Sequence, residues 1–141
     1  MDAYEIFEYA ESLGMTLSCH PTKDEDMRAL AKSFKNTEIV YAHPGEKPML
    51  LEHISRMKDC DNIHIDLSGT GVMRYGVVKE LINCVGKERI LFGTDYPVCN
   101  PAMYVGAVLY EELTDDELEH IFYKNAERIY KHTFTSSDAI A

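Results

Sequence analysis

The feature that most constrains this chain is a regular alternation of short apolar runs with amphipathic helical segments. Four short, mainly apolar runs, at residues 15–19, 39–42, 62–67 and 90–92, predict strands. The polar residues at their ends, His20, His43, Asp66 and Asp95, lie 23, 23 and 29 residues apart. Each interval has room for one strand, one helix and two loops. Strict alternation of this kind predicts an α/β fold with a parallel sheet.

The segments between these runs carry apolar residues at helical spacing. The predicted stripes are Ala3, Ile6, Phe7 and Ala10; Met27, Leu30, Ala31 and Phe34; Leu50, His53, Ile54 and Met57; Val78, Leu81, Ile82 and Val85; and Leu118, Ile121, Phe122 and Ile129. Residues 22–25 and 114–117 have the Thr-x-x-Glu pattern of a capping box, which predicts two of the helix starts. Residues 133–141 lack any pattern, so we expect one domain over 1–132 and a flexible tail.

Composition limits the classes of partner. The formal net charge is −10, which argues against binding to nucleic acid or to anionic membranes, since phosphates require concentrated Lys and Arg. The apolar runs are too short for a transmembrane helix, which needs about 20 residues. The first residues show no secretion signal, so we expect a cytoplasmic protein whose four cysteines are reduced.

Three of the four strand ends carry a residue able to bind a metal, each with a proline behind it: His20, His43 and Asp95. In parallel α/β folds the carboxyl ends of the strands meet at one edge, where the chemistry gathers. Histidine and carboxylate ligands suit zinc or another divalent ion. For any one of these residues the alternative is a hydrogen-bonded histidine or a loop cap. Their recurrence on successive units favours a site.

Further polar residues lie on or near the third strand, where His64, Asp66 and Ser68 share one face. We expect Asp66 to hold a neighbouring loop or a group behind the metal ligands rather than a metal. His64 lies deeper, as a hydrogen-bonded interior histidine. Residues 125–128, taken alone, read as part of a surface helix. No function is assigned to His53, His120 or His132.

Taken together, these residues resemble the amidohydrolase-related metal-dependent hydrolases, in particular the subgroup with aminocarboxymuconate-semialdehyde decarboxylase and the resorcylate decarboxylases. The resemblance spans about residues 2–131. The segments that carry it are LSCHP at 17–21, IVYAHPG at 39–45, IHIDLSG at 63–69, RILFGTDYP at 89–97 and NAER at 125–128. The Gly-Thr-Asp-Tyr-Pro part is the most specific of them.

The resemblance implies a TIM (β/α)8 barrel, of which this chain supplies the C-terminal half, strands five to eight. His20 would match the fifth-strand metal ligand, and His43 the sixth-strand histidine that ligates or orients the reactive water. Asp95 would match the eighth-strand aspartate, a metal ligand or proton acceptor. The implied cofactor is a divalent metal, with zinc expected. The implied reaction is hydrolysis or decarboxylation of a small-molecule substrate by a metal-bound water.

The family's first strand carries a His-x-His pair that completes the site, and this sequence contains no His-x-His. One hypothesis is therefore the C-terminal part of an enzyme whose partner is a missing N-terminal half-barrel. A second is a non-catalytic remnant or a self-associating homo-oligomer, because a lone half-barrel leaves two sheet edges unpaired. A third, an open doubly wound domain that binds an anion, is disfavoured because the chain has no glycine-rich phosphate turn.

Overall fold

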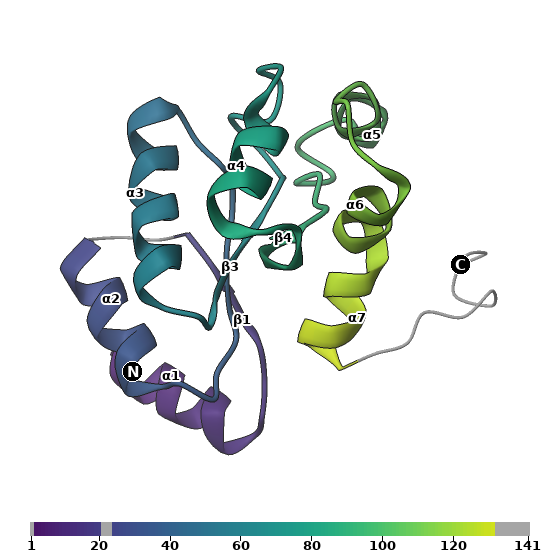
Figure 1. Cartoon of the computed structure of the whole chain (residues 1–141). Coiled ribbons are helices and arrows are strands. Elements are labelled where there is room, and N and C mark those ends of the chain that lie inside the picture. The colour runs from purple at the N-terminus through teal and green to yellow at the C-terminus, as the bar shows by residue number, and fades with distance from the viewer. Residues whose placement is uncertain (1, 21–23, 132–141) are drawn as a thin grey trace.

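Helices alternate with four parallel strands in the computed structural model, which describes residues 2–20 and 24–131 (Figure 1). The elements are α1 Ala3–Ser12, β1 Leu17–Cys19, α2 Asp24–Ser33, β2 Ile39–Tyr41, α3 Lys47–Asp59, β3 Ile63–Asp66, α4 Val77–Val85, the 3-10 turn η1 Lys87–Arg89, β4 Ile90–Leu91, α5 Pro101–Leu109, α6 Asp115–Glu119, the π-helical segment η2 His120–Lys124 and α7 Asn125–Tyr130. The predicted alternation is confirmed. The expected capping box at 22–25, His132 and the expected tail fall outside the described residues.

The strands lie in chain order, β1-β2-β3-β4, and every neighbouring pair is parallel. Cys19 is in register with Tyr41, and Tyr41 with Ile65, so the first three strands end level with one another. This register brings the segments that follow these strands to the same edge of the sheet. His20 and His43 belong to those segments.

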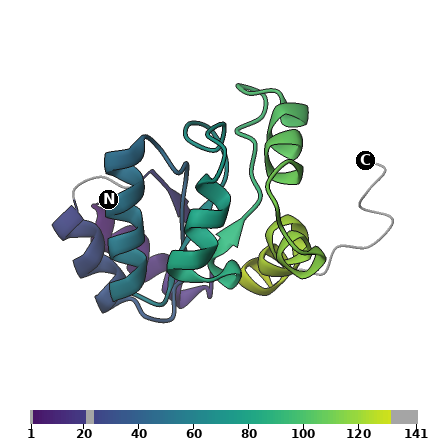
Figure 2. The ribbon, with the colours of Figure 1, turned by 45° about the horizontal axis from the view of Figure 1, so that its top comes forward.

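The two faces of the sheet are covered differently. Helices α2, α3 and α4 lie side by side along the outer face (Figures 1 and 2), where the strand residues Ile39, Ile63 and Ile65 are fully buried. On the inner face a smaller cluster forms between Val40, Leu91 and Ile129 of α7. The last helix therefore covers part of the inner face.

The segment η2–α7 also covers the edge of β4 that faces away from β3. Leu91 accepts a hydrogen bond from Leu67 on the β3 side, at 2.9 Å. On the opposite side, the Phe92 N–H donates to the Ile121 carbonyl at 2.8 Å. The Asn125 side chain donates to the Ile90 carbonyl, also at 2.8 Å. Helical groups thus satisfy backbone atoms of β4 that another strand could otherwise bind, whereas β1 has β2 as its one strand neighbour among the described residues.

At the amino ends of the strands, side chains bind backbone carbonyls. The Asn62 amide donates to the carbonyls of Ala31, Phe34 and Thr37, at 3.0–3.1 Å. Arg89 donates to the carbonyls of Ile63 and Cys60, both at 2.8 Å. Asn125 adds a bond to the Lys87 carbonyl at 2.7 Å. These contacts fix the return loops to the strands that they enter.

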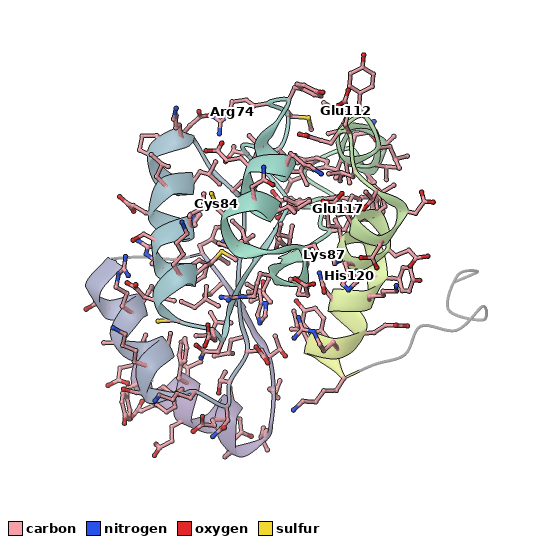
Figure 3. The ribbon with its side chains drawn as sticks, in the orientation of Figure 1. Arg74, Cys84, Lys87, Glu112, Glu117 and His120 are labelled. Atoms are coloured by element: carbon pink, nitrogen blue, oxygen red, sulfur yellow. The ribbon has the colours of Figure 1, made fainter. Side chains whose placement is uncertain are left out.

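Ion pairs attach α6 to the preceding units. Lys79 of α4 binds Glu117 at 2.9 Å, and Lys87 of η1 binds Asp116. Figure 3 shows Lys87, Glu117 and His120 close together where η1 meets α6 and η2. The predicted capping box is present, since the Thr114 hydroxyl accepts from the Glu117 N–H and the Glu117 carboxylate accepts from the Thr114 N–H.

Helix α5 was not predicted from the sequence. It begins at Asn100, whose side chain accepts from the Ala102 N–H at 3.0 Å, and Pro101 occupies its first turn. The predicted last helix begins as expected but contains the π-helical segment η2. No helix within residues 2–20 and 24–131 is long and apolar enough to cross a bilayer.

Candidate metal and catalytic site

The carboxyl ends of β1 and β2 bring together two of the three predicted site residues. The Nε2 atoms of His20 and His43 lie 2.8 Å apart, and their ring centroids are 4.7 Å apart. His20 is exposed and His43 is half-buried. The prediction that strand-end residues 23 positions apart meet at one edge therefore holds for this pair.

His43 has an unusual backbone conformation for a residue other than glycine. Its φ is +71°, in the left-handed region. The His43 N–H points to Asp66 Oδ1 at 3.4 Å, a long hydrogen bond across to the next strand. Strained backbone of this kind gathers at functional sites, where surrounding contacts hold it.

Asp66 and Ser68 form a hydrogen-bonded chain that ends on the His43 imidazole. Asp66 Oδ1 accepts from the Ser68 N–H at 2.9 Å and also from the Ser68 hydroxyl. Ser68 Oγ lies 2.9 Å from His43 Nδ1. Asp66 thus holds the neighbouring loop of His43, which is the role expected for it from the sequence.

Two glycines make room for this chain of contacts. A Cβ atom at Gly69 would lie 2.3 Å from His43 Nδ1, and Gly69 has a φ of +57°. A Cβ atom at Gly93 would lie 3.1 Å from the Ser68 Cβ. The sequence indicated a turn at Gly69, but the structure shows that the missing side chain also leaves space for the imidazole.

Asp95 is exposed and follows β4 with a φ of +61°. Its carbonyl accepts from the N–H groups of Val98 and Cys99, at 2.9 and 3.1 Å, which closes the loop before α5. The described residues contain no group of three or more His, Cys, Asp or Glu side chains placed to hold a metal ion. The structure therefore brings His20 and His43 together without joining Asp95 to them as a third ligand.

Tyr104 of α5 is a site neighbour that the sequence did not reveal. Its hydroxyl donates to the Gly69 carbonyl at 2.7 Å, beside the His43 imidazole. Burial raises the pKa of Tyr104 to about 12, and the nearby Cys99 and Asp95 act in the same direction. Tyr104 is thus a protonated donor that fixes the Gly69 turn. Tyr104 was not predicted as a site residue because α5 was not predicted as a helix.

A cavity of about 560 Å³ lies beside His20 but does not include His43 or Asp95. It is formed between α1 and α2 and is lined in part by Phe7, Met27 and Leu30. Cys19 also lines it, and burial raises the pKa of this thiol to about 11. Cys19 is therefore a neutral thiol. The cavity reaches the His20–His43 pair through His20, which is one of its lining residues, and not through His43.

The donor set of the histidine pair fits a divalent ion as two of its ligands. Two imidazole nitrogens bound to one tetrahedral zinc at ~2.1 Å would lie ~3.4 Å apart. The observed separation of the Nε2 atoms is 2.8 Å, so a small movement of the exposed His20 ring would admit an ion. Two ligands are fewer than the three or four that hold zinc firmly in proteins.

Comparison with known protein families matches residues 1–132 to the family described as Amidohydrolase. A search of the curated proteins found no match. Solved structures with the same arrangement include a 2,6-dihydroxybenzoate decarboxylase in complex with 2,6-dihydroxybenzoate. That match has 17% identity and a TM-score of 0.69, and it covers 91% of this chain and 54% of the other.

Two further solved structures are similar to this chain. The 5-carboxyvanillate decarboxylase from Sphingomonas paucimobilis has 21% identity and a TM-score of 0.70, over 91% of this chain and 52% of the other. A dihydroxybenzoic acid decarboxylase from Polaromonas sp. JS666, with bound manganese and the inhibitor 2-nitroresorcinol, has 13% identity and a TM-score of 0.66, over 91% and 53%. The chain spans about half the length of these proteins.

Proposed function

This chain belongs to the amidohydrolase family, and we propose that it acts as the C-terminal half-barrel of a metal-dependent hydrolase or decarboxylase. The observation that carries the proposal is the His20–His43 pair, with facing Nε2 atoms at the carboxyl ends of adjacent parallel strands. In this proposal residues 1–132 supply strands five to eight of a TIM barrel in the cytoplasm. The partner would be an N-terminal half-barrel that carries His-x-His.

Each site residue has a proposed role. His20 holds the metal through Nε2, and Asp95 supplies a second ligand or accepts a proton. His43 orients the reactive water and takes its proton. The ion, for which we propose zinc, would lower the pKa of a coordinated water and polarise the substrate. Manganese in the Polaromonas decarboxylase supports a divalent ion in this fold.

We propose a small aromatic carboxylic acid as the substrate class. The support comes from the decarboxylases of similar fold, one of which is in complex with 2,6-dihydroxybenzoate. His20 and Asp95 are both exposed in the half-barrel, so a substrate could reach them from the open side of the sheet. Closing the barrel would exclude bulk water and strengthen the polar contacts to the carboxylate.

The amount of metal bound by the assembled barrel tests this proposal. The chain is mixed with the N-terminal half of a related decarboxylase that carries His-x-His, dialysed against zinc or manganese, and analysed by mass spectrometry for bound metal. We expect about one divalent ion per pair, because four ligands bind far more tightly than two. The double variant His20→Ala plus Asp95→Ala should lower the metal content of the pair. Equal metal content in both samples, or none in either, would contradict the proposal.

A second function is favoured by the edge of β1, which has no strand neighbour except β2 among the described residues, and by Asp95 lying apart from the histidine pair. In that case the chain is a non-catalytic half-barrel that associates with itself. Analytical ultracentrifugation separates the two hypotheses. A stable dimer that forms without metal, and that the double variant leaves unchanged, supports self-association over catalysis.

A further inference from the structure

We propose that Ser68 and Asp66 are positioning residues that keep a proton on His43 Nδ1, so that the Nε2 lone pair of His43 faces the reaction site. The catalytic meaning of this inference rests on the proposed function, but the protonation state itself does not. The inference concerns which nitrogen of a neutral imidazole carries its proton, a choice set by the hydrogen bond at the other nitrogen.

The first step is the role of Asp66 Oδ1. Two backbone N–H groups, those of Ser68 at 2.9 Å and His43 at 3.4 Å, point to this single oxygen atom. A backbone N–H can only donate. Asp66 Oδ1 therefore acts as an acceptor, and the Ser68 hydroxyl, which also contacts it, is the donor in that contact.

The second step follows from the single proton of a serine hydroxyl. Ser68 uses this proton in its bond to Asp66, so it has only lone pairs to offer at its other contact. That contact is His43 Nδ1, at 2.9 Å. A lone pair on Nδ1 would face a lone pair on Oγ at hydrogen-bond distance, so Nδ1 must carry the proton and donate it to Ser68.

The third step identifies the donor and the acceptor in the contact between His20 and His43. A neutral His43 with its proton on Nδ1 has an unprotonated Nε2, which can accept a proton or bind a metal. His20 Nε2, 2.8 Å away, is the donor to it. An ion held by His20 Nε2 would require the His20 proton to reside on its Nδ1 instead, while the lone pair of His43 Nε2 would stay directed at the same place. The chain Asp66–Ser68–His43 thus orients a base before any ion arrives.

Packing keeps the imidazole in this orientation. Ser68 is 5% exposed, and Gly69 and Gly93 bring backbone close to the contacts on either side. A flip of the ring about its Cβ–Cγ bond would put Cδ2 in place of Nδ1 and break the bond to Ser68. His64 provides an internal contrast, since its Nε2 lies 2.6 Å from the Glu38 carboxylate, which favours the opposite tautomer.

Long-range 15N–1H correlation spectra of the isolated chain report which nitrogen of each neutral histidine is protonated. We expect His43 as the Nδ1–H tautomer and His64 as the Nε2–H tautomer. The variant Ser68→Ala should move His43 toward Nε2–H by about 5-fold in tautomer ratio, the factor equivalent to one lost hydrogen bond. His64 should not change in that variant.

A matched pair of substitutions at Asp66 keeps the test independent of any one variant. Asp66→Asn retains an oxygen acceptor at the position that the three donors use, so His43 should remain Nδ1–H. Asp66→Ala removes the acceptor and should shift the ratio as Ser68→Ala does. Wild-type His43 in the Nε2–H form, or a folded Ser68→Ala with an unchanged ratio, would overturn the inference. Since no metal or partner is added, a failure here is distinct from a failure of metal binding.

Discussion

The two ends of the sheet are built from different kinds of contact. At the amino end, the amide and guanidinium groups of Asn62, Arg89 and Asn125 donate to backbone carbonyls of neighbouring loops. At the carboxyl end, His43 and Asp95 adopt left-handed backbone conformations. In barrel folds of this type the carboxyl end carries chemistry and the amino end carries stability. In this chain, contacts that satisfy backbone carbonyls and residues with left-handed backbone therefore lie at opposite ends of the same four strands.

The carboxyl end carries structural costs that the amino end does not. Left-handed backbone at residues other than glycine costs on the order of 1 kcal/mol each. The amino-end contacts satisfy backbone carbonyls of the return loops. Substitutions at the amino end should therefore lower the free energy of unfolding, whereas those at the carboxyl end should also change the geometry of His43.

The largest expected effect is at the amino end, in Asn125→Ala. Asn125 is 1% exposed and donates to two backbone carbonyls, which the substitution would leave buried and unsatisfied. We expect the free energy of unfolding to fall by about 3 kcal/mol, measured by urea denaturation. Asn36→Ala, at an exposed position, is the control and should change it by less than about 0.5 kcal/mol. Equal losses of unfolding free energy in the two variants would show that the amino-end contacts stabilise the fold no more than an exposed residue does.

Next in size is Gly69→Ala at the carboxyl end. The added Cβ would meet the His43 imidazole and would sit on a left-handed residue, so we expect a loss of about 2 kcal/mol in unfolding free energy. The His43 ring resonances should move as well. Gly106→Ala in α5 is the matched control, since its Cβ meets no atom within 4 Å. It should raise stability by about 0.5–1 kcal/mol, because alanine favours helix.

Acid should destabilise the chain through His53, which lies buried on the outer face. Burial lowers the pKa of His53 to about 4, with Arg56 acting in the same direction and the His43 backbone opposing both. Because the folded pKa is below that of the unfolded chain, the unfolded state binds more protons in acid. Stability is then full above about pH 6.5 and falls as the pH is lowered toward about 4.

We expect the loss from His53 to be up to about 3 kcal/mol at the lower end of that range. Urea titrations across the range measure it, and His53→Gln should flatten the slope. His64, whose pKa burial also lowers, should contribute less because protonation there strengthens its contact with Glu38. If the pH dependence of the unfolding free energy persisted in His53→Gln and vanished in His64→Gln, His64 rather than His53 would be its source.

The smallest expected effect is at an ion pair away from both ends of the sheet. The Lys79 side chain is 40% exposed and that of Glu117 is 13% exposed, and their pair joins α4 to α6. Lys79→Met should lower the free energy of unfolding by no more than about 0.5 kcal/mol, because an ion pair whose cation stays in contact with water contributes little. Thermal unfolding at low and high salt checks this. A loss comparable to that of Asn125→Ala would mean that stability is not concentrated at the amino end.

Much of this fold follows from local signals in the sequence. The strand runs, the helical stripes and the Thr114–Glu117 capping box each depend on residues close in the chain, and all appear in the structure. The pairing of His20 with His43 also follows, because equal spacing of parallel units makes strand ends level. The contact of Asp66 with a neighbouring loop could be predicted from the same spacing.

What the sequence did not reveal depends on contacts between distant residues. Helix α5 lacks an amphipathic stripe, so only Asn100 and Pro101 marked its start. Asn125 read as part of a surface helix, yet it is buried against β4. The direction of the Ser68 hydroxyl depends on how two loops approach each other, and no local pattern encodes that. The separation of Asp95 from the histidine pair is likewise a property of the loop after β4.

The covering of β4 by η2 and α7 limits how copies of this chain can aggregate. Growth of a fibril by strand pairing needs two available edges on every molecule, one to receive and one to pass on. Here the β4 edge is already bound by the Ile121 carbonyl and the Asn125 amide. Within residues 2–20 and 24–131, the sheet edge left for pairing with another copy is therefore that of β1. Two copies paired through their β1 edges would offer no further edge of this described sheet to a third copy.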